Sequence, residues 1–236
     1  PSAIPPTTPV YHRPFKNDPL IVSNDIMIGI DLSNDPTKFE KLRGFAIDLV
    51  NQLSFSDNPN CYAGGSRFTI HALSALGFDS TYYYNWKSDN VIALKTLNSI
   101  VPFGDGGNYS IQSTNPKLDS GYGTAGGTTI NEDFCPNRGR IYILLTSNTP
   151  SEASDTNYVN PDFFGHGVHP IIVSYDMKDS SYYDKFASED NYNVMSHYKY
   201  QDDGNDINNF ISKYLVDSSD ELNCQNKKEE TTITLS

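Results

Sequence analysis

The sequence has few basic residues and no long apolar run. Only 17 of its 236 residues are Lys or Arg, against 29 Asp and Glu, so the formal net charge is −12. This excess of negative charge disfavours binding to nucleic-acid phosphates and to anionic membrane surfaces. No apolar stretch approaches the roughly 20 residues that a membrane-spanning helix needs. We therefore expect neither a nucleic-acid partner nor membrane insertion.

Two kinds of functional site have no support in the sequence: a zinc site built from cysteines and a serine site for acyl transfer. The three cysteines, Cys61, Cys135 and Cys224, match no zinc-binding spacing. In an oxidising compartment, two of the three cysteines can form a disulfide, in any of three pairings, and the third remains a free thiol. The alternative is three reduced, buried thiols. A Gly-x-Ser-x-Gly motif is absent from the sequence, so acyl-transfer catalysis has no support.

The composition of the chain is that of a globular protein, with 37% hydrophobic and 19% charged residues. We expect a Pro-rich extended lead-in over 1–20, one domain over 21–224 and a charged, disordered tail over 225–236. Abundant Tyr, Asn, Ser and Thr beside few basic residues favour an extracellular, secreted protein. Asn108 begins an Asn-Tyr-Ser glycosylation sequon, which matters only if the chain is secreted.

The most informative stretch is IMIGIDLSND, over 26–35, where an apolar run ends in oxygen-bearing side chains at alternate positions. The residues after it have helical spacing of apolar positions over 37–55. A buried strand therefore delivers Asp31, Ser33 and Asp35 to its carboxyl end, where ligands bind in open α/β sheets. Oxygen ligands of this kind suit Mg²⁺ or Ca²⁺.

A purely structural role for these side chains is the alternative. Ser33 or Asp35 can cap the helix that follows, with Pro36 at the first helical position.

Strands and helices alternate along the rest of the sequence. The pattern predicts strands over 21–31, 67–75, 81–86, 140–146, 168–175 and 192–195. It predicts helices over 37–55, 91–100 and 182–187, and a last helix that Asp206 caps. The expected fold is a three-layer, doubly wound α/β domain, with a mostly parallel sheet and one antiparallel edge strand from the 67–75 and 81–86 hairpin.

Taken in order, several of these segments resemble the von Willebrand factor A (vWA) family over about residues 21–224. The segments are IMIGIDLSNDPTKFEKLRGFAIDLVNQLSF, DNVIALKTLNSI, RIYILLTSN and HPIIVSYDM. The resemblance implies a Rossmann-like vWA fold. It also implies a non-catalytic adhesion module that binds a protein or glycan ligand at the carboxyl edge of the sheet, with Asp31 and Asn148 at that same edge.

The family's metal-ion-dependent adhesion site is only partly matched. The family pattern is Asp-x-Ser-x-Ser, a Thr in a Gly-Gly-Thr-like loop, and an Asp after the central strand. Asp31 and Ser33 match, Asp35 replaces the second Ser, and Thr128 follows two glycines but lies late in the sequence.

The last part of the pattern departs further. Asn108 stands where the loop Thr is expected directly after the second helix, and Ser147 and Asn148 replace the Asp-Gly pair. The resemblance thus implies a degenerate site with no metal or weakly bound Mg²⁺ or Ca²⁺, and with Asn108, Ser147 and Asn148 on the ligand-binding face.

An enzymatic alternative starts from the same aspartate. The chain also resembles the haloacid dehalogenase phosphotransferases, in which the first Asp is the nucleophile. The residues that carry this resemblance are Asp31 after a buried strand, Ser147 after another, and Asp202 and Asp203 later. The acid–base Asp of that family would fall on Ser33, which cannot act as a general acid near neutral pH. The alternative function is a Mg²⁺-dependent phosphohydrolase.

Overall fold

The computed structural model of the chain describes residues 24–53, 66–74, 81–87, 90–102, 108–111, 139–154, 168–183 and 196–216. The elements are β1 (Asn24–Asp31), α1 (Pro36–Gln52), β2 (Arg67–Leu73), β3 (Thr81–Lys87), α2 (Asn90–Ser99), β4 (Gly139–Thr146), η2 (Ser151–Ser154), β5 (His169–Tyr175), β6 (Ser196–Tyr200), α5 (Asp206–Phe210) and η3 (Ile211–Val216).

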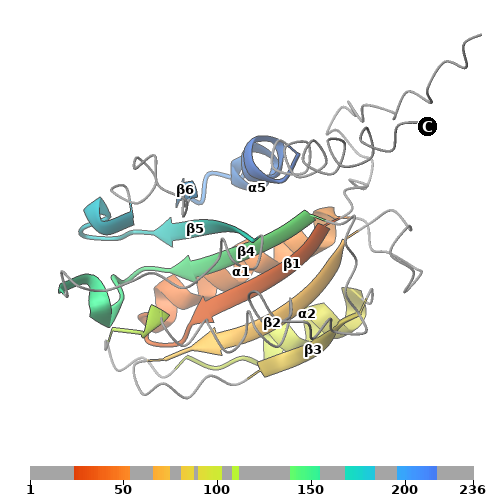
Figure 1. The fold of residues 1–236 in the computed structure, drawn as a ribbon, viewed down its shortest axis with the longest axis horizontal. Coiled ribbons are helices and arrows are strands. Elements are labelled where there is room, and N and C mark those ends of the chain that lie inside the picture. Colours follow the sequence, from red (N-terminus) through yellow and green to blue (C-terminus); the bar gives the residue numbers. More distant parts are fainter. Residues whose placement is uncertain are drawn as a thin grey trace, which may run out of the picture.

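The six strands form one sheet in the order β3-β2-β1-β4-β5-β6 (Figure 1). β1 pairs in parallel with β2 and β4, and the parallel pairing continues through β5 to β6. β3 pairs antiparallel with β2 at the edge. This is the doubly wound strand order, in which the direction of winding reverses between β1 and β4. The predicted mostly parallel sheet is confirmed.

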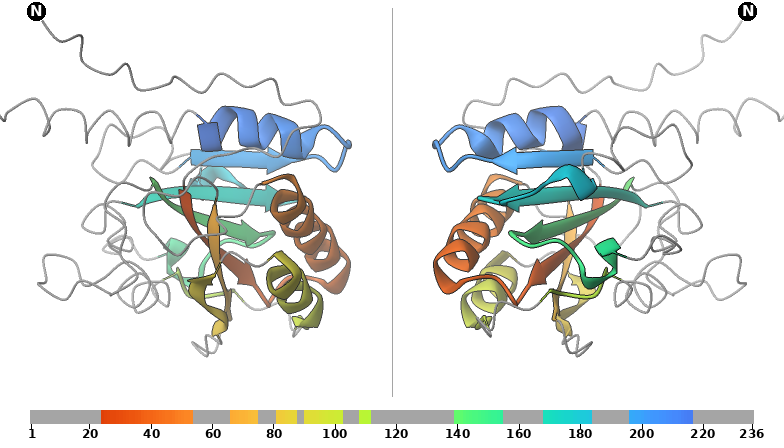
Figure 2. Two further views of the ribbon diagram at one scale, coloured as in Figure 1. Left: turned by 90° about the vertical axis from the view of Figure 1, so that its right-hand side faces the viewer. Right: turned by 90° about the vertical axis from the view of Figure 1, so that its left-hand side faces the viewer.

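Apolar side chains cover both faces of the sheet. Ile26, Ile28 and Ile30 of β1 pack on one face in a core that includes residues of α1, α2 and α5. Figure 2 shows α1 and α2 side by side on that face. Met27 points to the other face, where the core includes Tyr109 from the segment 108–111 and Tyr183 from the segment after β5. The predicted three-layer α/β architecture is confirmed.

Helix α1 forms as its sequence predicts. Asp35 is the N-cap residue, and Pro36 occupies the first turn, where its missing N–H costs no hydrogen bond. The buried positions follow helical spacing: Phe39, Leu42, Phe45, Ala46, Leu49 and Val50. This helix fixes the segment between Asp31 and Asp35 against the end of β1.

Two predictions near the C-terminal end were wrong, the position of the last strand and the N-cap residue of the last helix. The last strand is β6 at Ser196–Tyr200, whereas the predicted 192–195 lie outside the described residues. The last helix begins at Asp206, but its N-cap residue is Asn205. The carboxylate of Asp206 accepts instead from the Tyr198 hydroxyl at 2.7 Å and from the backbone N–H of Asp203 at 2.9 Å.

Other predictions fall on residues that the structure does not describe. These are the lead-in over 1–20, the tail over 225–236, Thr128 and the three cysteines, Cys61, Cys135 and Cys224. Within the described ranges, none of the helices has both the length and the apolar character needed to cross a membrane.

Candidate functional site

The candidate site lies where β1 and β4 end side by side. In doubly wound sheets the reversal of winding leaves a crevice at the carboxyl ends of the two central strands, and ligands bind there. β1 ends at Asp31 and β4 ends at Thr146. The side-chain amide of Asn148 donates to the Asp31 carboxylate over 3.1 Å, which confirms that these residues meet at one edge.

Asp31 is fully buried and is the hub of the site. Its Oδ1 accepts from the backbone N–H of Ser33 at 2.9 Å and from the Ser33 hydroxyl at 2.5 Å. Its Oδ2 accepts from the Thr146 hydroxyl at 2.9 Å and from the Asn148 amide. Burial raises the pKa of Asp31, and the hydrogen bonds from Ser33, Thr146 and Asn148 offset part of that rise.

Asn34 links the two strand ends and was missed in the sequence. Its Oδ1 accepts from the backbone N–H of Ser147 at 2.8 Å and from the Ser147 hydroxyl at 2.6 Å. Its Nδ2 donates to the backbone carbonyl of Asp31 at 2.7 Å. The sequence did contain a signal for this role: Asn34 follows the end of a buried strand, and its amide side chain can both donate and accept hydrogen bonds between two loops.

Asp35 caps α1, as the structural alternative predicted. Its carboxylate accepts from the backbone N–H of Thr37 at 2.9 Å and of Lys38 at 3.4 Å, and the residue is exposed. Ser33, by contrast, points its hydroxyl into the site. The carboxylate of Asp35, at the position of the second Ser in the vWA pattern, therefore stabilises the start of the helix.

Two buried tyrosines support the Asn148 loop. The Tyr183 hydroxyl donates to the backbone carbonyl of Asn148 at 3.1 Å, and the Tyr109 and Tyr183 hydroxyls are hydrogen-bonded to each other. Burial raises the pKa of both phenols well above the usual value, so both are neutral. The backbone carbonyl of Tyr109 accepts from the N–H of Ser151 at 2.8 Å, which places the exposed Asn108 near the segment that follows β4. Glycosylation of Asn108 stays a prediction.

The residues predicted for the metal and ligand face thus have different surroundings. Ser147 is largely buried and bonds to Asn34, whereas Asn148 is half-buried at the edge. Asp31 is the one carboxylate in this hydrogen-bonded cluster. Among the described residues, no three His, Cys, Asp or Glu side chains come together as a metal-binding group. This donor set is poor in charge for Mg²⁺ or Ca²⁺.

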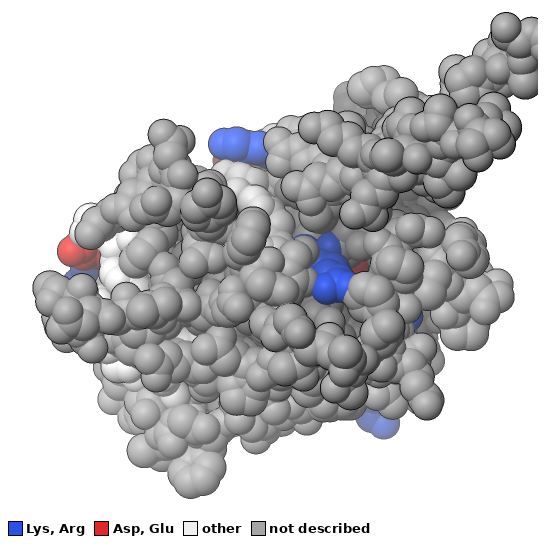
Figure 3. Space-filling model, in the orientation of Figure 1, with Lys and Arg blue, Asp and Glu red and all other residues white. Residues whose placement is uncertain are grey.

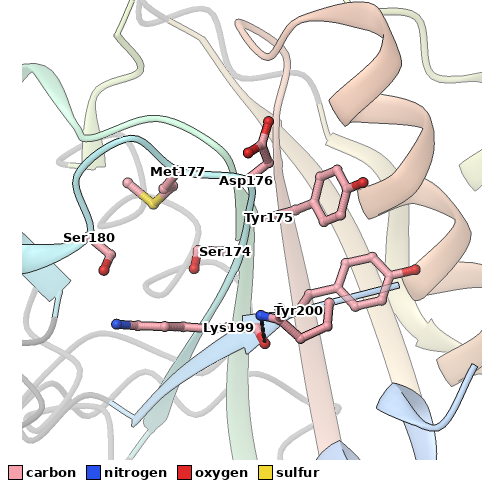
Figure 4. Close-up of a pocket in the computed structure, with 8 residues that line it drawn as sticks. Ser174, Tyr175, Asp176, Met177, Ser180, Lys199 and Tyr200 are labelled. Carbon is pink, nitrogen blue, oxygen red and sulfur yellow. Dashed lines mark hydrogen bonds between the residues drawn. The ribbon is translucent and has the colours of Figure 1, made fainter. Parts of the chain in front are cut away.

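A polar recess of about 340 Å³ lies at the same edge of the sheet, at the ends of β5 and β6 (Figure 4). It is lined by Ser174, Tyr175, Asp176, Met177, Ser180, Lys199, Tyr200 and Gln201. In Figure 4 the rings of Tyr175 and Tyr200 point to one side of β5, with ring centroids 5.3 Å apart, and Ser180 and Lys199 lie on the other. The Tyr200 ring packs against Phe45 of α1, so the recess itself offers hydroxyl, amine and amide groups.

Two lysines of α1 hold the loops that border the recess. Lys38 Nζ lies 2.6 Å from the backbone carbonyl and 3.0 Å from the carboxylate of Asp176. Lys41 pairs with the carboxylate of Asp202 at 2.6 Å. Both aspartates have positive φ, 45° and 61°, a conformation that Asp tolerates better than most residues. The rim of the recess is thus fixed against the helix that Asp35 caps.

The acidic residues needed for phosphoryl transfer are not gathered. Asp202 bonds to Lys41 and to the Tyr200 hydroxyl, and β6 is three strands from β1, roughly 14 Å at ordinary strand spacing.

On the face shown in Figure 3, the charged side chains of the described residues form small separate groups, with no continuous patch of one sign.

Comparison with known proteins gives similarity at the level of structure. No protein-family profile matches the sequence, and no curated protein matches it. Proximal thread matrix protein 1 from the mussel byssus is similar with a TM-score of 0.57 and 16% identity, over 85% of this chain and 48% of that one. This chain therefore spans about half the length of the mussel protein.

Two further solved structures carry metals. The mussel protein with a zinc-occupied MIDAS motif, the metal-ion-dependent adhesion site, is similar with a TM-score of 0.55 and 17% identity, over 85% of this chain and 49% of that one. The manganese-loaded TRAP protein of Plasmodium vivax is similar with a TM-score of 0.54 and 13% identity, over 82% of this chain and 72% of that one. The strand order, the site at the end of β1 and these similarities together show that the chain has a vWA-like fold.

Proposed function

We propose that the chain is a non-catalytic, extracellular binding module of vWA type that holds a protein ligand at the carboxyl edge of its sheet. The observation that carries this proposal is the polar recess between β5 and β6, which opens at the same edge as the Asp31 and Asn148 cluster. Exposed lining groups such as Lys199 and Gln201 give a ligand donors and acceptors at a rigid rim. A glycan ligand is the second partner, because the hydroxyl, amine and amide groups of the recess also suit a sugar.

The chemistry around Asp31 supports binding over catalysis. Its hydrogen-bond partners are Ser33, Thr146 and Asn148, none of which titrates near neutral pH. A phosphohydrolase needs a general acid beside its nucleophile, and Ser33 occupies that position. The comparisons lend no support to the phosphohydrolase alternative.

The similar solved proteins support an adhesive role outside the cell. One is a matrix protein of mussel byssal threads. The metal-bearing structures among them support cation use in the fold, but the donor set here, with one carboxylate, favours weak metal dependence or none. We therefore propose that the ligand is a matrix or cell-surface molecule, and that removal of divalent cations by a chelator does not weaken its binding.

A binding panel with matched charge reversals tests the proposal. Immobilised extracellular-matrix proteins and glycans are probed with the wild type, with Lys199→Glu at the recess and with Lys213→Glu, an exposed lysine of η3. We expect binding to at least one protein, weakened at least tenfold by Lys199→Glu, retained by Lys213→Glu and insensitive to EDTA.

Three outcomes contradict the proposal. Binding that both variants weaken equally places the ligand elsewhere, and binding to glycans alone replaces the protein ligand with a sugar. Mg²⁺-dependent hydrolysis of an aryl phosphate that disappears in Asp31→Asn makes the chain an enzyme.

A further inference from the structure

The amide nitrogen of Asn148 is surrounded by three oxygen atoms from the end of β1. Nδ2 lies 3.1 Å from Asp31 Oδ2, 3.4 Å from Ser33 Oγ and 3.3 Å from Asn34 Oδ1. A carboxylate, a hydroxyl and an amide carbonyl are the oxygen types that bind hard divalent cations. In this chain they converge on a nitrogen that belongs to the protein itself.

The distances fit hydrogen bonds and exclude a cation at the same place. Bonds from Mg²⁺ or Ca²⁺ to oxygen are roughly 2.0–2.6 Å long, whereas these three contacts have the length of long N–H···O bonds. An amide group has two N–H donors, so the three acceptors share them. With Nδ2 there, the oxygens of Asp31, Ser33 and Asn34 have no room for a metal ion between them.

The position of Asn148 is fixed by its backbone. Its carbonyl accepts from the Tyr183 hydroxyl at 3.1 Å, and its N–H donates to Thr146 Oγ1 at 3.0 Å. The side chain is therefore held over Asp31 by groups from β4 and from the segment at 181–183. Where the vWA pattern has Gly after the Asp, this chain has Asn148, and Gly would leave the space open.

We propose that the side-chain amide of Asn148 takes the place of the divalent cation as the group that bridges Asp31, Ser33 and Asn34. The site is thus assembled without metal, and replacing the Ser147-Asn148 pair by Asp-Gly converts it into a cation site. Adding the carboxylate alone does not, because the amide still occupies the space.

The experiment is a cation titration of four proteins by thermal melting and calorimetry, with Mg²⁺ and Mn²⁺ as the probes. The proteins are the wild type, Ser147→Asp, Ser147→Asp/Asn148→Gly and the same double variant with Asp31→Ala. We expect the double variant to gain a Tm increase with Mn²⁺ that EDTA reverses and Asp31→Ala removes. The wild type and Ser147→Asp show no such increase.

Several results overturn the inference. These are a cation-dependent Tm increase in the wild type, equal binding by Ser147→Asp and the double variant, or a folded double variant that binds no cation. If the double variant does not fold, the wild type gives the answer by NMR. The side-chain NH₂ signals of Asn148 are expected to stay sharp in Mn²⁺, and their broadening at micromolar Mn²⁺ overturns the inference.

The inference rests on the proposed function only for the biological use of this edge. The titration tests the Asn148 amide by itself, and the ligand panel tests binding at the recess. A metal-free site with no ligand at the recess would refute the proposed function alone. A wild type that binds Mn²⁺, with a ligand complex at the recess that is insensitive to EDTA, would refute the inference alone.

Discussion

The amide of Asn148 and the carboxylate of Asp31 are hydrogen-bonded over 3.1 Å, although the two residues lie 117 positions apart in the sequence. The bond joins the ends of β1 and β4, the two strands between which the winding of the sheet reverses. It forms only when these strands pair in the register that sets Ile30 opposite Leu145. The candidate site is therefore a product of correct sheet assembly.

The tyrosine pair beneath this bond gives the first prediction. Tyr183 donates its one hydroxyl hydrogen to the Asn148 carbonyl, so Tyr109 must donate to the Tyr183 oxygen. Tyr183→Phe leaves the buried Tyr109 O–H without that acceptor and should cost about 1–3 kcal/mol of unfolding free energy. Tyr109→Phe keeps the bond to Asn148 and should cost less.

Urea unfolding of the single and double variants measures this order. The double Phe variant should cost less than the sum of the two single variants, because it leaves neither hydroxyl stranded. A larger loss in Tyr109→Phe than in Tyr183→Phe would reverse the assigned direction of the hydrogen bond.

A buried ion pair at the opposite end of β1 gives the second prediction. Arg67 Nε and Nη2 bond to Asp25 Oδ1 and Oδ2 at 2.7 and 2.6 Å, with side chains only 4% and 6% exposed. Asp25→Ala leaves a buried guanidinium without this partner and should cost about 3–5 kcal/mol. Asp25→Leu/Arg67→Met should recover much of that loss in the same urea experiment.

The same variants also separate stability from binding. Asp25 is near the start of β1 and the candidate site is at its end, so binding by any folded fraction should be unchanged. If the double variant is no more stable than Asp25→Ala, the other contacts of these two side chains contribute more to the free energy of unfolding than the ion pair does.

The sequence predicted the elements that carry a strong local pattern. β1 and β4 are continuous apolar runs, and α1 has apolar residues at helical spacing. β6 was misplaced because SHYKY alternates polar and aromatic residues and is only five residues long. Tyr200 is buried and Tyr198 half-buried by partners that the local pattern does not reveal: the ring of Tyr200 lies 5.1 Å from that of Phe45 in α1.

The site was predicted in its location but not in its bonding. Asp31 and Ser33 stood out because polar residues follow an apolar strand. The roles of Asn34 and Asn148 depend on partners more than 100 positions away, which no local pattern contains. Asp35 shows the converse, because helix capping by the nearest N–H groups decided the role of a side chain that had also been predicted as a metal ligand.

Asp206 gives a prediction of pH dependence. Burial alone would raise its pKa, but hydrogen bonds from the Tyr198 hydroxyl and from the N–H groups of Asp203 and Gln201 outweigh burial and lower the pKa below 3.8. A carboxylate with a lowered folded pKa stabilises the fold above the unfolded pKa, and that stabilisation is lost as pH falls through the folded value.

Asp206→Asn should therefore be less stable than the wild type at neutral pH, by about 1–3 kcal/mol, because a charged acceptor is replaced by a neutral one. The difference should shrink as pH falls below about 3.8. Urea unfolding at several pH values measures it, with Val50→Ala as a control whose loss does not depend on a titrating side chain. A difference that grows in acid would contradict the prediction.

Two glycines in different surroundings give the last prediction. A Cβ on Gly29 in β1 would clash with the Tyr142 hydroxyl and lie 3.0 Å from His71 Nε2, whereas a Cβ on Gly44 in α1 would meet nothing within 4 Å. Gly29→Ala overpacks a buried layer and should cost about 1–3 kcal/mol. Gly44→Ala should stabilise the protein by about 0.5–1 kcal/mol, because Ala loses less backbone entropy in a helix.

Tyr142→Phe added to Gly29→Ala removes the clashing oxygen and should restore part of the loss. Urea unfolding midpoints of the four proteins make the comparison. If Gly29→Ala proves as stable as the wild type, the close packing of Tyr142 over β1 is wrong.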